Sequence, residues 1–175
     1  MFDTNGNYVN LEAPEYEDFS YDEPTWSEIL PNLWQGGTGE RDDFSETSYA
    51  PRATPEVTAE HFDFVATLYA WAKPVDWFVR EYRYGFYDGN LTDASLDELH
   101  AVAEMAHAEW KRGSRVLIRC QAGWNRSGLV MALVLMKEGY TADDAIDLIR
   151  DRRTKYALCN ETFVEYLVGL DNQKQ

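Results

Sequence analysis

The sequence predicts an α/β domain with a central, mostly parallel sheet flanked by helices. Strand-like segments alternate with helical ones along the chain, and residues 115–119 (RVLIR) form a compact apolar strand near its middle. A strand of this kind is typical of a parallel sheet that is covered on both faces. The length of 175 residues and a hydrophobic content of 45% suit one domain with its own core.

The first half of the chain supplies three predicted strands. Residues 30–36 follow a proline-marked entry, residues 62–69 are β-branched and aromatic, and residues 79–86 alternate as a strand does. The turn residues Asp88-Gly89-Asn90 come next. Residues 37–60 are polar and predict a long loop or a short helical excursion.

The second half is mainly helical. A helix is predicted from Ser95, which forms a capping box with Glu98, to Gly113. After the strand at 115–119 and a glycine-containing loop, a helix continues through Met136 and stops at Gly139. Two more helices fit residues 141–152, with Thr141 as N-cap, and residues 161–170.

The charge is unevenly distributed. The net charge is −15, and residues 1–40 hold nine acidic and no basic residues. We therefore expect residues 1–27 to form an acidic N-terminal arm and residues 28–175 to form the functional domain. So acidic a chain disfavours a general binder of nucleic acids or anionic membranes. In contrast, residues 111–137 carry six basic and no acidic residues, which predicts a cationic environment around this segment.

Membrane and export signals are not expected. The longest apolar run, residues 129–136, is far shorter than the roughly 20 residues of a membrane span. The first ten residues lack a basic stretch and an apolar core of the secretory type. With only Cys120 and Cys159, a disulfide scaffold is not expected either, so the prediction is a cytoplasmic protein.

The segment that indicates chemistry is CQAGWNRSG. It places Cys120 at a strand end, Arg126 six positions later, Ser127 next, and a helix immediately after. Phosphate sites are built in this way, because loop amides and a helix N-terminus converge on the anion. Gly123 lets the loop curl, and Arg126 can donate two hydrogen bonds to a phosphoryl group. The predicted phosphate-binding residues are Gln121, Ala122, Gly123, Trp124, Asn125 and Arg126.

The same residues predict a reaction. An electropositive loop favours the thiolate form of Cys120, which makes it a nucleophile. Ser127 is placed to hydrogen-bond the sulfur and help it leave in a second step. Loop amides and Arg126 can stabilise the transition-state charge, so neither a metal nor another cofactor is expected.

These residues resemble a known family. Residues 120–127 are similar to the C-x5-R-[ST] signature of the cysteine-dependent protein tyrosine phosphatase superfamily. The sequence CQAGWNRSG looks most like the small dual-specificity branch of that superfamily. ILPNLWQGG and FDFVATLY resemble the first strands of that family. DDAIDLIRDRR and the NETF segment at 160–163 resemble its last helices, so the likeness covers roughly residues 28–170.

The resemblance implies a general acid on a separate loop about thirty residues before the cysteine. Asp88 fits this position, while its rival Asp93 lies just before a helix and suits an N-cap. One departure is Arg119, which stands where the family usually has histidine. Because neighbouring side chains alternate along a strand, Arg119 is a candidate to point away from the loop.

Other residues leave alternatives open. Arg153 matches a family arginine that binds a second substrate phosphate, or it is a solvated helix end. Cys159 is a packed thiol or the partner of Cys120 in a regulatory disulfide. His61, His100 and His107 are expected at the surface and not at a metal.

The predicted function is hydrolysis of phosphotyrosine, with phosphoserine and phosphothreonine as further substrates, through a cysteinyl-phosphate intermediate. The expected partner is a phosphoprotein, with no nucleic acid and no membrane, and the chain is expected to be a monomer. Three alternatives stay open: an RNA 5′-phosphatase of the same fold, a phosphoinositide phosphatase, and a phosphate-binding pseudophosphatase.

Overall fold

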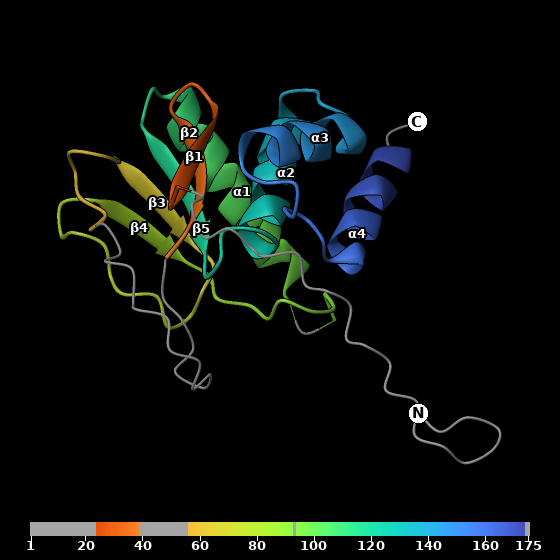
Figure 1. Ribbon diagram of the computed structural model, residues 1–175, viewed down its shortest axis with the longest axis horizontal. Coiled ribbons are helices and arrows are strands. Elements are labelled where there is room, and N and C mark those ends of the chain that lie inside the picture. The colour runs from red at the N-terminus through yellow and green to blue at the C-terminus, as the bar shows by residue number, and fades with distance from the viewer. Residues whose placement is uncertain (1–23, 39–55, 93, 174–175) are drawn as a thin grey trace, which may run out of the picture.

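The computed structural model describes residues 24–38, 56–92 and 94–173. Five strands form one sheet in the order β1-β2-β5-β3-β4 (Figure 1). Their bounds are β1 Trp26–Leu30, β2 Leu33–Gly37, β3 Phe64–Thr67, β4 Arg80–Arg83 and β5 Val116–Cys120. Of the four strand pairs in these described ranges, β1–β2 is antiparallel and the other three are parallel. The predicted α/β class with a mostly parallel sheet is therefore confirmed.

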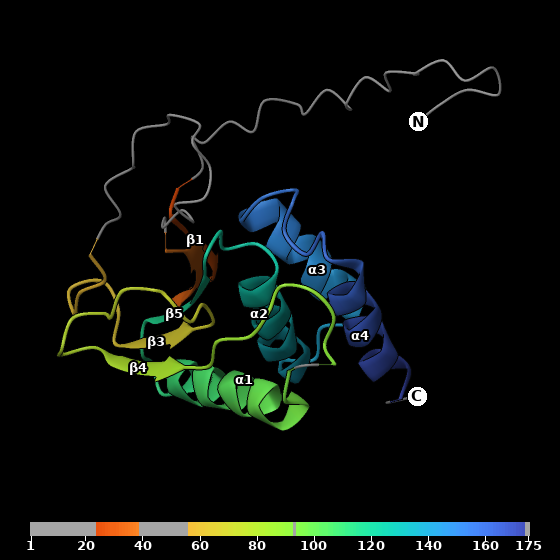
Figure 2. The same cartoon turned by 90° about the horizontal axis from the view of Figure 1, so that it is seen from below.

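Four helices accompany the sheet in the described part of the chain: α1 Leu96–Lys111, α2 Arg126–Lys137, α3 Ala142–Arg152 and α4 Glu161–Asn172. Figure 2 shows them gathered on one side of the sheet, with α2 between α1 and the α3–α4 pair. Helix α2 is buried along almost its whole length, as its run of apolar residues requires. The helix that follows the glycine-containing loop thus lies at the centre of the fold.

The side chains of strand β5 alternate between the two faces of the sheet. Ile118 and Cys120 belong to the large core on the helical side, whereas Leu117 packs with Phe62 and Val65 in a smaller cluster on the other side. Side chains alternate along a strand, so Arg119 shares the second face with Leu117. This alternation decides which residues of β5 reach the loop after Cys120.

The strand expected at 30–36 is present as β2, but it begins at Leu33, and Leu30 belongs to a separate strand. The structure has a hairpin of β1 and β2 there, in which Leu30 pairs with Leu33 across a Pro31-Asn32 turn. Asn32 has a φ of 65°, a left-handed conformation that asparagine tolerates better than most residues. Strand β1 begins at Trp26, two residues before the expected start of the functional domain.

The helix ends follow the sequence signals with one exception. Gly113 and Gly139, which follow α1 and α2, have φ values of 92° and 94°. Ser95 accepts a hydrogen bond from the Glu98 N–H, but the reciprocal half of the capping box is not formed. The Ser95 N–H donates to Tyr84 Oη instead, and the Glu98 carboxylate accepts from Tyr82 Oη.

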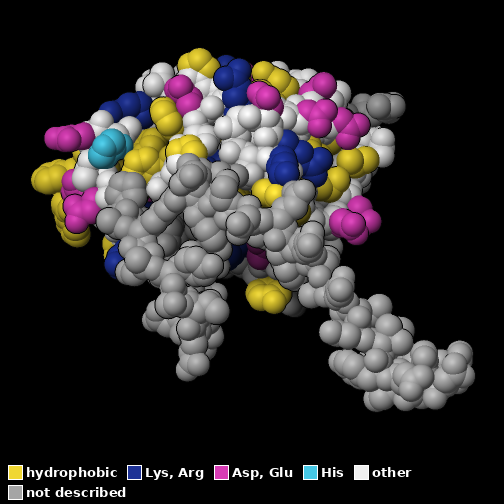
Figure 3. Space-filling model, viewed as in Figure 1, with side chains coloured by type: hydrophobic (Ala, Val, Ile, Leu, Met, Phe, Trp, Pro, Cys, Tyr) yellow, Lys and Arg dark blue, Asp and Glu magenta, His cyan; other side chains and the backbone are white. Residues whose placement is uncertain are grey.

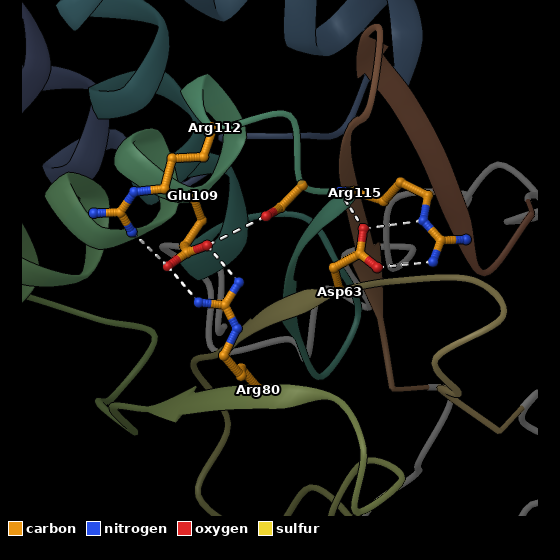
Figure 4. Close-up of polar contacts among 6 residues, drawn as sticks. Asp63, Arg80, Glu109, Arg112 and Arg115 are labelled. Carbon is orange, nitrogen blue, oxygen red and sulfur yellow. Dashed lines mark hydrogen bonds and ion pairs between the residues drawn. The ribbon is translucent and has the colours of Figure 1, made fainter.

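Ion pairs join the segments at the edge of the sheet where β3, β4 and β5 begin (Figure 4). Asp63 accepts from Arg115 at 2.9 and 3.1 Å, and these contacts lower the pKa of Asp63 to about 2. Glu109 of α1 pairs with Arg80 at 2.5 Å and with Arg112 at 2.9 Å. The hydrogen bonds from Arg80 are the main reason that the pKa of Glu109 is lowered.

These pairs correct the expectation of a cationic environment. Five of the six basic residues in 111–137 pair with carboxylates: Lys111 with Glu138, Arg112 with Glu109, Arg115 with Asp63, Arg119 with Glu81, and Lys137 with Glu104. On the face shown in Figure 3, basic and acidic side chains are interspersed. The basic residues that are close in sequence are therefore neutralised locally and spread over several elements.

Among the helices that the structure describes, none combines the length and apolar character needed to cross a membrane.

Candidate active site

Cys120 ends strand β5, and its side chain is only 1% exposed. Its Sγ lies 3.3 Å from the Oγ of Ser127, which is fully buried in the first turn of α2. The strand and the helix therefore bring together two residues that the sequence assigned to one reaction. Both cysteines are free thiols: Cys120 is buried, while Cys159 is exposed and donates to Asn125 Oδ1 at 3.4 Å.

The loop from Cys120 to Trp124 has its carbonyl oxygens bound by groups outside the loop. Cys120 O and Gln121 O accept from the Thr38 N–H at 2.9 and 3.0 Å, and Trp124 O accepts from the Leu158 N–H at 3.4 Å. Ala122 O accepts from Arg153 Nη2 at 3.3 Å. Gly123 O accepts from Gln35 Nε2 at 3.1 Å and from Arg153 Nε at 3.2 Å. Five consecutive carbonyls are thus directed toward the surrounding protein.

The direction of these carbonyls fixes the direction of the loop amides. The described residues contain no cis peptide bond, and in a trans peptide the N–H points opposite to the carbonyl of the preceding residue. The N–H groups of residues 121–125 therefore point away from the donors that hold the carbonyls. This is the arrangement that an anion-binding loop requires.

Gly123 makes the close packing of the loop possible. Its φ of 77° is left-handed, and a Cβ at this position would lie 2.3 Å from the carbonyl carbon of Gly36. A Cβ on Gly37 would in turn lie 2.7 Å from Gln121 O. The glycines at the end of β2 and in the loop are therefore required by a backbone-to-backbone contact.

Arg126 begins α2 and is buried, with 8% of its surface exposed. Its Nη1 donates to Phe86 O at 3.2 Å, and its guanidinium lies 5.3 Å from the centre of the Tyr69 ring. The buried Nε has no hydrogen-bond partner in the part of the chain that the structure describes. A buried N–H of an arginine without an acceptor indicates a place for an anionic ligand.

Asp88 lies on the loop after β4 and is held beside the loop of Cys120. Asn125 Nδ2 donates to its Oδ2 at 3.3 Å, and Asn160 Nδ2 donates to its Oδ1 at 3.1 Å. The structure thus brings Asp88 to the same site as Asn125, 37 residues later in the chain. The rival acid Asp93 lies outside the described residues.

Arg119 points away from the site, as the alternation of β5 predicted. Its Nε donates to Thr67 Oγ1 at 2.9 Å, and its Nη2 contacts Glu81 Oε1 at 3.2 Å and Lys73 O at 2.8 Å. The side chain is buried on the second face of the sheet. The cation before Cys120 is therefore neutralised there by a carboxylate of β4.

Arg153 caps α3 beneath the loop and is 7% exposed. Besides Ala122 O and Gly123 O, it donates to Pro24 O at 2.6 Å, so it joins the loop to the segment before β1. The alternative of a solvated helix end was wrong, because the side chain is buried. The suggestion that Arg153 binds a second phosphate stays a prediction.

The three histidines lie apart and contact ordinary partners. His61 contacts Thr58 Oγ1 at 3.0 Å, His100 contacts Tyr166 Oη at 2.7 Å, and His107 contacts Glu138 at 2.7 Å. The expectation that His100 and His107 are exposed was wrong, because both are half-buried. Within the described ranges, no three His, Cys, Asp or Glu side chains are grouped so as to hold a metal ion.

Sequence reasoning missed Gln35 and Asn160. Gln35 is fully buried in β2, where a polar side chain in an apolar strand is a detectable signal of a specific hydrogen bond. Asn160 was noticed only as part of a helix start. Its contact with Asp88 spans 72 residues, and no local pattern announces it.

The mostly parallel sheet and the strand-to-helix loop from Cys120 to Arg126, with Asp88 beside it, agree with the cysteine-dependent tyrosine phosphatase superfamily. The family model "Dual specificity phosphatase, catalytic domain" matches residues 56–173. The chain belongs to this family of phosphatase enzymes, in agreement with the resemblance seen in the sequence.

Individual proteins are similar to this chain in sequence or in fold. The protein named "Putative tyrosine phosphatase 123R" of Invertebrate iridescent virus 6 is 29% identical over 70 residues, which are 37% of this chain and 49% of the viral protein. The chain thus matches about half the length of that curated relative. Human DUSP28 shares the fold with a TM-score of 0.67 and 18% identity, over 87% of this chain and 96% of its own. A mouse "putative dual specificity phosphatase" shares the fold with a TM-score of 0.66 and 20% identity, over 96% of this chain and 94% of its own.

Proposed function

We propose that the protein hydrolyses phosphotyrosine in protein substrates, and also phosphoserine and phosphothreonine, through a cysteinyl-phosphate intermediate. The observation that carries this proposal is the loop of Cys120. The carbonyls of residues 120–124 face the surrounding protein, and the buried Nε of Arg126 has no acceptor among the residues that the structure describes. A phosphoryl group bound there accepts from the amides of residues 121–126 and from the Arg126 guanidinium.

In the first step the Cys120 thiolate attacks phosphorus. The sulfur–phosphorus bond forms as the bond from phosphorus to the substrate oxygen breaks. Asp88 transfers its carboxyl proton to that oxygen, so the alcohol or phenol leaves neutral and Asp88 becomes a carboxylate. Loop amides and Arg126 stabilise the charge on the equatorial oxygens, so residues of this chain supply every role in the step.

In the second step water releases the phosphate. The Asp88 carboxylate accepts a proton from water, whose oxygen bonds to phosphorus as the sulfur–phosphorus bond breaks. Inorganic phosphate forms, Asp88 is again protonated, and Cys120 leaves as a thiolate. Ser127 Oγ, 3.3 Å from Sγ, donates a hydrogen bond to the departing sulfur.

The test is phosphate release from a panel of substrates by the wild-type chain and three variants. Cys120→Ser abolishes turnover of a phosphotyrosine peptide, and Asp88→Ala lowers it by about 10²–10⁴-fold, the usual contribution of a general acid. Cys159→Ser is the matched control, because it removes the other, exposed thiol, and it keeps most of the activity. Full activity in Cys120→Ser would overturn the mechanism.

The same panel decides the substrate class. It contains phosphotyrosine and phosphoserine peptides, an RNA 5′-triphosphate and a phosphoinositide. The proposal expects the highest kcat/KM with phosphotyrosine. A higher value with RNA or with the lipid would replace the protein substrate, and binding of all four without phosphate release would identify a phosphate-binding pseudophosphatase.

A further inference from the structure

We propose that Asn160 is a positioning residue that, together with Asn125, holds the carboxyl group of Asp88 over residues 120–126, which we call the phosphate loop. This inference deepens the proposed function and rests on the assignment of Asp88 as the general acid. It concerns two amide side chains from different segments that meet at one carboxylate.

Each oxygen of Asp88 has its own amide donor. Asn160 Nδ2 donates to Oδ1 at 3.1 Å and also to Gly89 O at 3.0 Å, so it binds both the side chain and the backbone of the acid loop. Asn125 Nδ2 donates to Oδ2 at 3.3 Å. A carboxylate on an exposed loop is thereby connected to the phosphate loop and to the start of α4.

The rest of the network fixes which way both amides point. Asn160 Oδ1 accepts from the Thr162 N–H at 3.1 Å as the N-cap of α4. Asn125 Oδ1 accepts from the Asn160 N–H at 3.2 Å. Since the oxygen of each amide already has a donor, the NH₂ group of each must face Asp88.

Asn125 donates to Asp88 and does not cap α2 with its side chain. It occupies the N-cap position of α2, where an asparagine side chain ordinarily accepts a hydrogen bond from the helix backbone. Here it makes no such bond. Its side chain is directed to Asp88 and Asn160 instead, which leaves the first N–H groups of α2 for an anion.

The arrangement has two chemical consequences. A general acid acts only when it lies within hydrogen-bond reach of the leaving oxygen, and two donors from separate segments restrict the motion of the carboxyl group. When Asp88 transfers its proton it becomes an anion, and the two NH₂ groups are already aimed at the charge that forms. Asn160 therefore acts through Asp88 and not on the substrate.

The experiment compares Asn160→Ser with the wild type on aryl phosphates of different leaving groups. Serine keeps the N-cap of α4 but has no NH₂ to reach Asp88. With phenyl phosphate, whose leaving phenol needs a proton, kcat/KM falls about tenfold, part of the usual contribution of a general acid. With p-nitrophenyl phosphate, whose leaving group is a much weaker base, it falls less than about twofold.

The control is Asn90→Ser, which makes the same substitution on the loop that carries Asp88. Asn90 accepts from Thr92 N and Oγ1 at 3.3 and 2.5 Å, and its side chain makes no contact with Asp88 among the contacts the structure describes. It should affect both substrates equally. Urea unfolding of Asn160→Ser checks that the cap is retained.

The outcomes separate this inference from the proposed function. An Asn160→Ser variant that loses the same factor on both substrates has only a structural defect, and the positioning role is then wrong. If Asp88→Asn itself shows no dependence on the leaving group, the assignment of the acid fails first. The two residues act as one unit if each single variant shows a loss in kcat/KM that depends on the leaving group, and if the double variant has the same kcat/KM as Asp88→Asn alone.

Discussion

Arg119 and Cys120 are adjacent in the chain, but their side chains lie on opposite faces of the sheet. Cys120 Sγ contacts Ser127 on the helical face, and the Arg119 guanidinium contacts Glu81 at 3.2 Å on the other. The cation before Cys120 thus belongs to a buried ion pair that joins β4 to the loop after β3. It supports the sheet behind the site.

Arg119→Met should therefore affect stability more than chemistry. Removing one partner of a buried ion pair leaves the other without its counter-charge, at a cost of about 3 kcal/mol. Glu81 keeps its contact with Arg83, which limits the loss. Urea unfolding measures the free energy, and kcat of the folded variant should stay within about fivefold of the wild type. Lost activity at unchanged stability would place Arg119 in the catalytic site instead.

Ser127→Ala should slow the second step selectively. In the proposed mechanism the hydroxyl donates to the leaving thiolate, and a hydrogen bond to a charged group contributes about 1.5–3 kcal/mol, or roughly 10- to 100-fold in rate. Stopped-flow measurement with p-nitrophenyl phosphate should show a burst of nitrophenol followed by a slow steady state. Ser127→Thr keeps the hydroxyl and should restore most of the steady-state rate. An alanine variant with an unchanged rate and no burst would exclude this role.

Gly123→Ala tests the backbone contact beneath the loop, and Gly139→Ala is its matched control. Both glycines have a left-handed φ, but a Cβ at Gly139 meets nothing within 4 Å while one at Gly123 meets Gly36 at 2.3 Å. The control should lose about 1 kcal/mol of unfolding free energy. Gly123→Ala should lose more and also bind vanadate far more weakly. Equal effects in both variants would mean that the contact with Gly36 yields readily.

Arg153→Lys separates loop support from recognition of a second phosphate. Lysine keeps the charge but cannot donate simultaneously to Ala122 O, Gly123 O and Pro24 O. If Arg153 supports the loop, kcat/KM for phenyl phosphate, which has a single phosphate, falls about tenfold or more. If it only binds a second phosphate, the loss is confined to doubly phosphorylated peptides.

The Asp63–Arg115 pair should make stability depend on acidic pH. The pKa of Asp63 is lowered from 3.8 to about 2 in the folded state. A depressed folded-state pKa contributes stability that is fully present above the unfolded value and is lost as pH falls from about 4 to about 2. Melting temperatures of the wild type and Asp63→Asn, measured from pH 6 to pH 2, should converge over that range. A constant difference down to pH 2 would contradict the lowered pKa.

Much of this fold could be predicted from the sequence because its signals are local. The apolar strand β5, the glycines after α1 and α2 and the spacing of Cys120 and Arg126 depend on neighbours in the chain. The β1–β2 hairpin was missed because Pro31-Asn32 interrupts an otherwise strand-like segment, and a left-handed asparagine gives only a weak turn signal.

The tertiary part of the site could not be predicted in this way. Asn160 meets Asp88 only because α4 begins beside the loop after β4, and Arg153 reaches the phosphate loop only because α3 ends beneath it. The basic residues at 111–137 are a further example. Four of their five carboxylate partners lie 27 to 52 residues away in the chain, so a charge pattern along the chain did not describe the charge in space.

The phosphate loop depends on groups outside itself for the hydrogen bonds to the carbonyls of residues 120–124. Its carbonyls are held by the residue after β2, by a side chain within β2, by the end of α3 and by the residues before α4. Opening the loop breaks hydrogen bonds to all of these elements, so we expect it to cost more free energy than opening a loop held by its own contacts. We therefore expect the loop to keep its shape as long as the surrounding elements stay packed.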